Sequence, residues 1–265
     1  MSLRFLPMIA VLVCFARPAT AQSVGPPDLP HQPPAQETAP GPHQQSVSWK
    51  GLIPNIASDQ RRIWSFPFHI VQRKEWLPVI GAVATTSALI ALDEVDTPPL
   101  RRTTDFRSFN TVVSSRNTAL FTAAVPASLL AAGYIGRDSY SRNTALLAGE
   151  AVADSEMLAV VIKTLDRRKR PENFQPQGNF ADSWFETKSS LGRGSFPSGH
   201  TIAAFSIATV IARRYGKHRW VPYLAYAAAG TVAFSRLTAS AHFPSDVFAG
   251  GVLGYSISRF IVLRH

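Results

Sequence analysis

Cysteine is almost missing from this sequence of 265 residues, which contains only Cys14. That residue lies in an N-terminal segment with the order of a secretory signal, namely Arg4, an apolar stretch over 5–16 and then Ala19-Thr20-Ala21. Cleavage after Ala21 would leave a mature protein without a thiol, which excludes a disulfide framework, a cysteine nucleophile and a cysteine metal site. We therefore predict an exported, periplasmic protein, with an uncleaved anchor or a lipid-modified Cys14 as less favoured alternatives.

Acidic residues are also scarce, since 17 Asp and Glu stand against 27 Lys and Arg, for a formal net charge of +10. The basic residues are nevertheless spread along the chain and flank apolar runs, and the only dense cluster is 167–170. This distribution disfavours nucleic acid as a partner and favours an anionic substrate or anionic lipid. Within the cluster we expect Arg167, Arg168 and Lys169 to lie at the surface, where they could face phospholipid head groups.

The alternation of apolar and polar residues that marks strands is nearly absent, and long apolar or amphipathic stretches take its place. This pattern predicts an all-α protein with helices over 61–72, 76–94, 107–135, 143–166, 199–215, 220–238 and 245–263. We expect Pro98-Pro99 to end the second helix, because proline removes a backbone donor. The run 117–136 carries no charge and is long enough to span a bilayer, whereas the other apolar runs are shorter. A membrane bundle and a soluble bundle are therefore both open.

The N-terminal part differs in composition from the rest of the chain. Residues 22–45 contain seven of the twenty prolines and show no periodic apolar pattern, as in an extended linker. We therefore divide the chain into a signal peptide at 1–21, a proline-rich disordered tether at 22–50 and a helical domain at 51–265.

Three segments in the second half concentrate the groups that a phosphate site needs. Each lies at a predicted helix end, and they are Lys163 with Arg170-Pro171, then Pro197-Ser198-Gly199-His200, then Ser235-Arg236 with His242 and Asp246. A phosphoryl group in transfer spreads negative charge over its oxygens, so its site needs fixed cations and aligned N–H donors. Lys163, Arg170 and Arg236 are predicted to supply the cations. Backbone N–H groups where Ser198-Gly199 opens a helix would bind the same anion.

The two histidines of these segments are predicted to divide the catalytic work. His242 lies four residues before Asp246, so the carboxylate can hold one ring nitrogen as N–H and leave the other free to attack phosphorus. That attack would form a phosphohistidine. His200 would protonate the leaving oxygen and later activate water. Because the cationic side chains supply the charge, we predict no metal ion and no other cofactor.

Together these segments resemble the signature of the type 2 phosphatidic acid phosphatase superfamily, K-x6-RP, PSGH and SR-x5-H-x3-D, at every fixed position. The resemblance covers about residues 163–246 through these motifs. It implies a compact helical bundle with a six-helix core, as in acid phosphatases and vanadium-dependent haloperoxidases, and a metal-independent phosphatase acting through His242. It also implies a phosphorylated substrate, with lipids such as phosphatidic acid or an isoprenoid pyrophosphate favoured, and contact with a membrane.

Other functions stay open at the level of the sequence. A periplasmic phosphatase of small phosphate esters would use the same residues, and a vanadate-dependent haloperoxidase would share the fold. A non-enzymatic anion binder is less favoured, because no motif residue is lost. We also predict that the aromatic loop 172–196 is a substrate lid, and that Glu150, Asp154 and Glu156 are buried partners of basic residues rather than a metal site.

Overall fold

Every regular element in the described part of the chain is helical. The computed structural model describes residues 47–69, 76–102, 105–174, 180–185 and 191–264, so the predicted signal peptide and most of the predicted tether lie outside the described residues. Within these ranges there is no strand, which confirms the all-α prediction. The α-helices are α2 (Trp49–His69), α3 (Trp76–Arg102), α4 (Arg107–Val112), α5 (Ser115–Ile135), α6 (Ser139–Asp166), α7 (Gly199–Arg214), α8 (Trp220–Thr238) and α9 (Pro244–Phe260).

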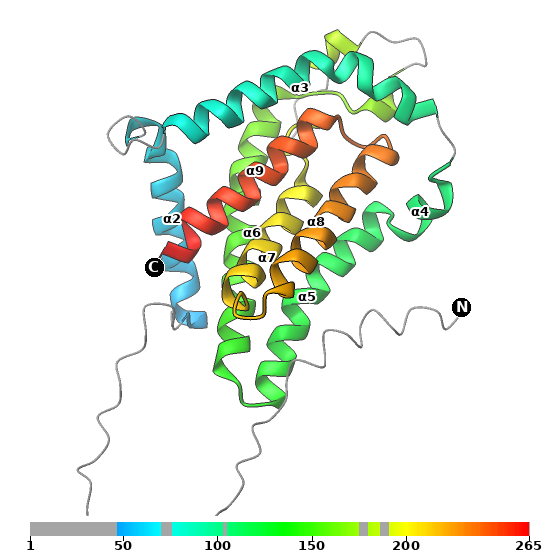
Figure 1. Ribbon diagram of the computed structural model, residues 1–265. Helices are drawn as coiled ribbons and strands as arrows, with labels where there is room; N and C mark the ends of the chain where they lie inside the picture. Colours follow the sequence, from blue (N-terminus) through cyan, green and yellow to red (C-terminus); the bar gives the residue numbers. More distant parts are fainter. Residues whose placement is uncertain (1–46, 70–75, 103–104, 175–179, 186–190, 265) are drawn as a thin grey trace, which may run out of the picture.

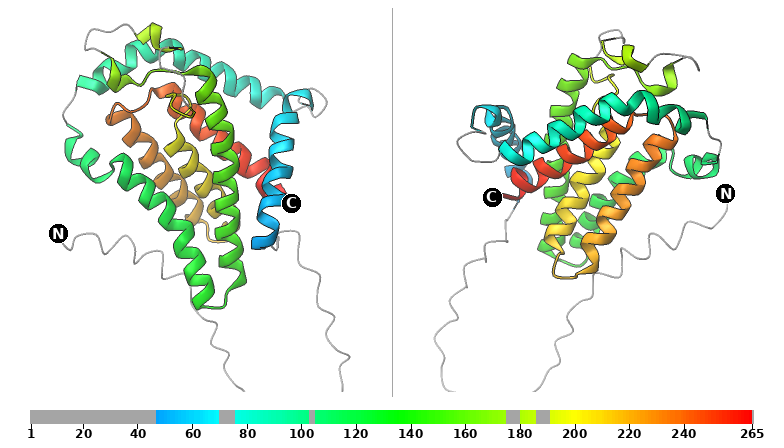
Figure 2. Two further views of the ribbon diagram at one scale, coloured as in Figure 1. Left: turned by 180° about the vertical axis from the view of Figure 1, so that it is seen from behind. Right: turned by 45° about the horizontal axis from the view of Figure 1, so that its top comes forward.

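Helix α7 lies in the middle of the bundle and packs against α5, α6, α8 and α9. Helix α3 crosses one end of this bundle, at the top of Figure 1, and packs on α9. The views in Figure 2 show the same crossing from behind and from above. Helix α2 packs along α6. The end of the bundle beneath α3 is where α6 and α8 end and where α7 and α9 begin.

Local signals set the ends of the helices that carry the motifs. Helix α6 begins where the Asp138 side chain accepts hydrogen bonds from the backbone N–H groups of Tyr140 and Ser141, and it ends at Arg167, whose φ of 48° is left-handed. Helix α9 begins with Pro244, whose missing N–H costs nothing in a first turn. The Asp246 carboxylate in that turn accepts from the Phe243 backbone N–H at 2.9 Å.

Two glycines of α9 allow this helix to lie directly against α7. A Cβ atom on Gly250 would be 2.7 Å from the Ser198 carbonyl oxygen, and one on Gly254 would be 2.5 Å from the Ile202 carbonyl oxygen. Both obstacles are backbone atoms, which cannot move aside as a flexible side chain can. The close contact of α7 with α9 therefore depends on glycine at these positions, and it brings the starts of the two helices together.

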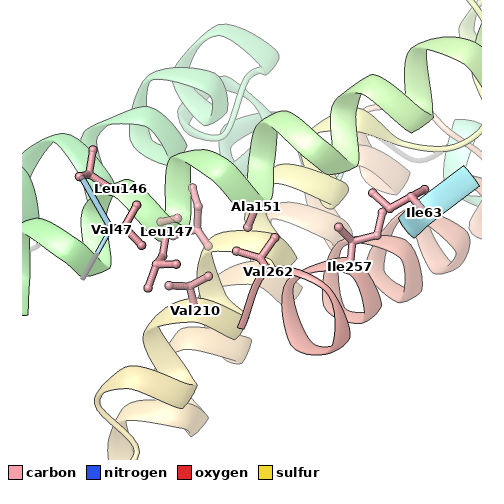
Figure 3. Packing of buried hydrophobic residues seen from close by; sticks show 10 residues of the cluster. Val47, Ile63, Leu146, Leu147, Ala151, Val210, Ile257 and Val262 are labelled. Atoms are coloured by element: carbon pink, nitrogen blue, oxygen red, sulfur yellow. The ribbon is translucent and has the colours of Figure 1, made fainter. Parts of the chain in front are cut away.

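The main hydrophobic core lies between α6, α7 and α9 and is closed by the N-terminal segment. Leu147 and Ala151 of α6, Val210 of α7 and Ile257 of α9 are buried against one another, and Ile63 of α2 joins them (Figure 3). Full burial of a side chain such as Leu147 contributes about 1.5–3 kcal/mol. This core holds the bundle beneath the motif residues.

Three predicted helix boundaries are wrong. Helix α2 begins at Trp49 rather than at 61, inside the range predicted for the tether. Helix α3 continues through Pro98-Pro99 to Arg102, because the two missing donors fall close to its end, where few intrahelical bonds remain to be lost. The predicted helix 107–135 is divided at Ser114, whose side chain accepts from the Asn117 backbone N–H and starts a new helix.

Three helical segments are long and apolar enough to cross a membrane, namely Trp76–Pro98, Ser115–Ile135 and Pro244–Arg264. The first two are almost entirely exposed and present large side chains such as Leu77, Ile80 and Leu120 outward. Exposed apolar surface of this extent marks a protein or membrane interaction site. It agrees with the predicted run 117–136 and adds α9, which the sequence alone did not indicate.

Candidate active site

The structure brings the three predicted segments together at the end of the bundle crossed by α3 (Figure 1). Lys163 lies in the last turn of α6, with Arg170 just beyond it, and Arg236 lies in the last turn of α8. Burial lowers the pKa of Lys163, of His200 and of Arg236, and the Arg170 charge lowers each of them further. The cationic residues are therefore close enough to act on one anion.

His242 is buried between α8 and α9 and is oriented by two partners. Its Nδ1 lies 3.5 Å from Asp246 Oδ2 and 3.3 Å from the Ser195 hydroxyl, and that hydroxyl donates to the same Oδ2 at 2.6 Å. Burial lowers the pKa of His242 to about 4, although the nearby Asp246 raises it. The ring is therefore neutral at pH 7, and Nδ1–H facing the carboxylate leaves the Nε2 lone pair as the nucleophile.

Ser195 was not predicted as a site residue. It lies in the stretch before the Pro197-Ser198-Gly199-His200 motif and is buried, and its hydroxyl joins His242 to Asp246. A single serine in a Gly- and Ser-containing loop carries no signal that separates it from its neighbours. Only the folded arrangement of the loop against α9 identifies it.

Arg168 is completely buried, so the prediction that it lies at the surface is wrong. It is only 1 % exposed, and its Nη1 donates to Asp246 Oδ1 at 2.7 Å while its Nη2 donates to Asp93 Oδ2 at 2.7 Å. The guanidinium also stacks 4.0 Å from the Phe243 ring centroid and 4.4 Å from that of Trp184. A buried arginine needs compensating charge, and here two carboxylates provide it.

Asp93 reaches this network from α3. Besides Arg168, it accepts from the Ser245 backbone N–H at 3.2 Å and from the Ser245 hydroxyl at 2.5 Å. The ion-pair chain from Asp93 through Arg168 to Asp246 thus ties α3 to the first turn of α9. Asp93 also escaped prediction, because it lies far from the motifs in the sequence and only the crossing of α3 over the bundle brings it to them.

Arg236 is held mainly by protein groups at the junction of α4 and α5. Its Nη1 donates to the Ser115 hydroxyl at 2.7 Å, and its Nη2 donates to the Val113 carbonyl at 2.5 Å and to the Thr118 hydroxyl at 3.1 Å. Its Nε donates to the neighbouring Ser235 hydroxyl at 3.1 Å. Among the described residues this leaves one N–H of Nη1 for a ligand. Its predicted contact with phosphate stays a prediction.

His200 is also bound to α5. Its Nε2 lies 3.0 Å from the Ser115 carbonyl oxygen, which can only accept, so Nε2 carries the proton. Burial lowers the pKa of His200, and the Arg236 and Arg170 charges lower it further. The side chain is therefore neutral at pH 7. A role as general acid requires that this proton be passed to the substrate instead of the carbonyl.

The start of α7 forms the floor of the site. The Ser198 backbone N–H donates to the Asp246 carbonyl at 3.0 Å, which fixes the start of α7 against that of α9. The Glu156 carboxylate lies close above Gly199, at 3.1 Å from the position of a Cβ atom on that glycine. Glu156 also interacts electrostatically with Lys163, as predicted for a buried partner of a basic residue.

The described part of the predicted lid 172–196 packs against the site. Phe174 and Phe180 form a buried aromatic cluster with Phe243, with ring centroids 5.0–6.4 Å apart. These two rings therefore stabilise the loop rather than present a surface for a lipid tail. Residues 175–179 and 186–190 of the predicted lid lie outside the described residues.

Residues 144–265 match the family model described as the PAP2 superfamily. Among curated proteins, the chain is 33 % identical over 103 residues to a lipid A 1-phosphatase of Rhizobium johnstonii, which is 39 % of this chain and 40 % of that protein. It is 32 % identical over 116 residues to a decaprenylphosphoryl-5-phosphoribose phosphatase of Mycobacterium tuberculosis, covering 44 % of this chain and 58 % of that protein. The chain thus spans less than two thirds of each relative's length.

Among solved structures, the chain is similar to a transmembrane PAP2-type phosphatidylglycerolphosphate phosphatase from Bacillus subtilis. The identity is 23 %, the TM-score is 0.45, and the alignment covers 68 % of this chain and 84 % of that one.

Proposed function

Since residues 144–265 belong to the PAP2 superfamily, we propose that this protein is a metal-independent phosphatase of lipid-linked phosphates that acts through a phosphohistidine on His242. The observation that carries the proposal is the orientation of this buried, neutral imidazole, whose Nδ1 faces Asp246 and Ser195. An imidazole held in this way offers a lone pair on Nε2 at neutral pH.

In the proposed first step, Nε2 of His242 attacks phosphorus and the bond to the leaving oxygen breaks. His200 gives its proton to that oxygen, so the leaving group departs as an alcohol or as a phosphorylated alcohol. Lys163, Arg170 and the remaining N–H of Arg236 stabilise the charge that develops on the other phosphate oxygens. The backbone N–H groups at the start of α7 bind the same oxygens.

In the proposed second step, water attacks the phosphohistidine. Neutral His200 takes a proton from this water, and inorganic phosphate leaves as His242 regains its neutral state. The Asp246 carboxylate stabilises the positive charge that the imidazole ring carries in the covalent intermediate. The chemistry is the same for a phosphate monoester and for a pyrophosphate, because only the leaving group differs.

A lipid substrate is proposed because of the surface around the site. Helix α3, which crosses the site, has an exposed apolar surface and is long enough to cross a membrane, as are α5 and α9. A lipid-linked phosphate would reach the cationic residues from such a membrane. The curated relatives named above are phosphatases of lipid substrates by their names. We place the site in the periplasm, on the strength of the predicted signal peptide.

The test is release of phosphate by the purified full chain from phosphatidic acid, an isoprenoid pyrophosphate and an aryl phosphate. We expect turnover of at least one lipid, and loss of all turnover in His242→Ala. His218→Ala is the matched control, because His218 is exposed and lies away from the motifs. Acid quench with substrate labelled in the phosphate should trap an acid-labile, alkali-stable phosphoenzyme in the wild type.

Three outcomes would contradict the proposal. Normal activity in His242→Ala would refute the nucleophile, and hydrolysis confined to small water-soluble esters would refute the lipid substrate. Halide oxidation that depends on added vanadate, without phosphate release from any of the three substrates, would refute the reaction class.

A further inference from the structure

Three carboxylates form a buried cluster outside the phosphate site. Asp59 of α2 lies beside Glu150 and Asp154 of α6, and one oxygen atom from each lies within 4.8 Å of the others. All three side chains are at most 1 % exposed. Glu150 and Asp154 are four residues apart and so share one face of α6. Lys163 lies thirteen residues beyond Glu150, which is about 20 Å along a helix.

Basic partners were predicted for Glu150 and Asp154, and the structure contradicts that prediction. The cation recorded at the cluster is Arg62, whose Nη1 lies 3.8 Å from Asp59 Oδ1 and whose side chain is 46 % exposed. Glu150 is hydrogen-bonded to Asn55 and to Asp59, and Asp154 Oδ1 accepts from Gln60 Nε2 at 2.9 Å. The contacts of the cluster are thus with neutral amides and with other carboxylates.

Two oxygens of the cluster have no hydrogen-bond partner among the described residues. They are Oε2 of Glu150 and Oδ2 of Asp154, and both belong to fully buried side chains. A buried carboxylate oxygen without a partner is costly, by about 1–3 kcal/mol or more for a charged group. Two such oxygens beside a third carboxylate indicate a ligand that supplies positive charge.

The dimensions and chemistry of the cluster fit one hard cation. Calcium binds oxygen at about 2.3–2.6 Å and magnesium at about 2.0–2.1 Å, so two oxygens on one ion lie at most about 5 Å apart. The ligand atoms here fall within that limit. The cluster contains no histidine or cysteine, which disfavours zinc and favours calcium, magnesium or manganese.

We propose that Asp59, Glu150 and Asp154 bind one divalent, oxygen-preferring cation that fastens α2 to α6. The ion neutralises two of the three negative charges, and Arg62 faces the third from the solvent side. The remaining groups packed here are apolar, such as Ile63 and Ala151 of the core. The site is separate from the phosphate chemistry, which needs no metal, and the proposal does not depend on the proposed phosphatase activity.

Without a cation, the cluster has to hold protons instead. Burial raises the pKa of Glu150 to about 7, and the Asp59 charge raises it further; burial likewise raises the pKa of Asp154 to about 7. A cation displaces these protons. Binding should therefore release protons at pH 6–7 and strengthen as the pH rises through this range.

The experiment uses the full chain after dialysis against a chelator. Free Mn²⁺ is followed by electron paramagnetic resonance, and Ca²⁺ and Mg²⁺ are tested by competition and by the thermal unfolding midpoint. We expect one tight equivalent per chain and a higher midpoint with the ion. In Glu150→Gln/Asp154→Asn, affinity should fall at least a hundredfold and the midpoint should no longer respond to the ion.

The matched control is Glu94→Gln/Asp96→Asn, which removes two exposed carboxylates of α3 and should bind as the wild type does. The single variant Asp154→Asn serves if the double variant does not fold. A wild type that binds none of the three ions at millimolar concentration, and whose stability changes only with pH, would overturn the proposal in favour of a proton-sharing cluster. Equal Mn²⁺ affinity in Asp154→Asn and the wild type would overturn it as well.

Discussion

Replacement of Arg168 by methionine tests the buried network that supports the nucleophile. Methionine keeps much of the side-chain volume but removes the positive charge that lies 2.7 Å from both Asp93 and Asp246. The two carboxylates would then be buried without their shared counter-charge. Because loss of one partner of a buried ion pair costs about 3–5 kcal/mol, Arg168→Met should destabilise the protein by at least that amount.

This loss is large compared with the whole stability of a domain. Folded domains are stable by about 5–15 kcal/mol, so the variant would lose a third or more of a typical value. The population of unfolded chains should rise about 10²- to 10⁴-fold, since each 1.36 kcal/mol is a factor of ten. Urea or thermal unfolding of the purified chain measures the change directly.

Activity should fall as well, through the position of Asp246. With Oδ1 of Asp246 released, only the contacts of Oδ2 with Ser195, Phe243 and His242 hold the carboxylate. Misplacement of a catalytic group by about 1 Å can cost about 10²-fold in rate, so kcat should fall by up to that factor. KM should change little, because Arg168 does not face the substrate in the proposed mechanism.

The neighbouring residue provides the control. Arg167 contacts only the exposed Phe185 ring among the printed ring contacts, at 5.8 Å from the centroid, and should tolerate methionine with a change below about 1 kcal/mol. If Arg168→Met and Arg167→Met were equally stable and equally active, the reasoning from the ion-pair network would be refuted.

Three further predictions concern the nucleophile and the packing. Ser195→Ala removes the hydroxyl that bridges His242 to its carboxylate and should lower kcat about tenfold to a hundredfold with KM nearly unchanged, since a hydrogen bond to a charged group is worth about 1.5–3 kcal/mol; a wild-type kcat would contradict this role. Because burial lowers the pKa of His242 to about 4, the stability that its neutral form contributes is present above pH 6.5 and lost as the pH falls through about 4. Unfolding measured across pH 4–7 should show a steeper acid loss than in His242→Gln. Gly254→Ala should destabilise by about 1–3 kcal/mol because its Cβ would meet the Ile202 carbonyl at 2.5 Å, whereas Gly230→Ala, with nothing within 4 Å, should be neutral or stabilising by up to about 1 kcal/mol; effects of the same sign would contradict the close packing.

Helical class and the positions of the motif residues were readable in the sequence because both depend on local patterns. Long apolar stretches without alternation indicate helices, and the predicted starts of α7 and α8 agree with the structure. The boundaries at Trp49, Ser114 and Arg102 were missed. There a serine cap and two prolines near a helix end decided the outcome, and each signal is compatible with more than one local structure.

The network beneath the nucleophile could not be predicted in the same way. The basic run 167–170 has the composition of a solvated helix end, yet the left-handed turn at Arg167 directs Arg168 inward. Asp93 and Ser195 carry no distinguishing pattern, and their contacts with Arg168, His242 and Asp246 join segments that are distant in the chain. Such contacts depend on how helices cross, which no local pattern records.

The sequence by itself therefore determined an all-α chain and the set of residues that the proposed phosphate chemistry uses, because helix periodicity and motif spacing are properties of short segments. Only the tertiary structure decided which of them are neutral, buried and oriented. The crossing of α3 over the bundle supplies Asp93 to Arg168, and the glycine contact of α9 with α7 brings Asp246 to the Ser198 backbone. The packing of α2 on α6 likewise created the carboxylate cluster. Burial and long-range contact set these charges and protons, and both arise only when the helices pack.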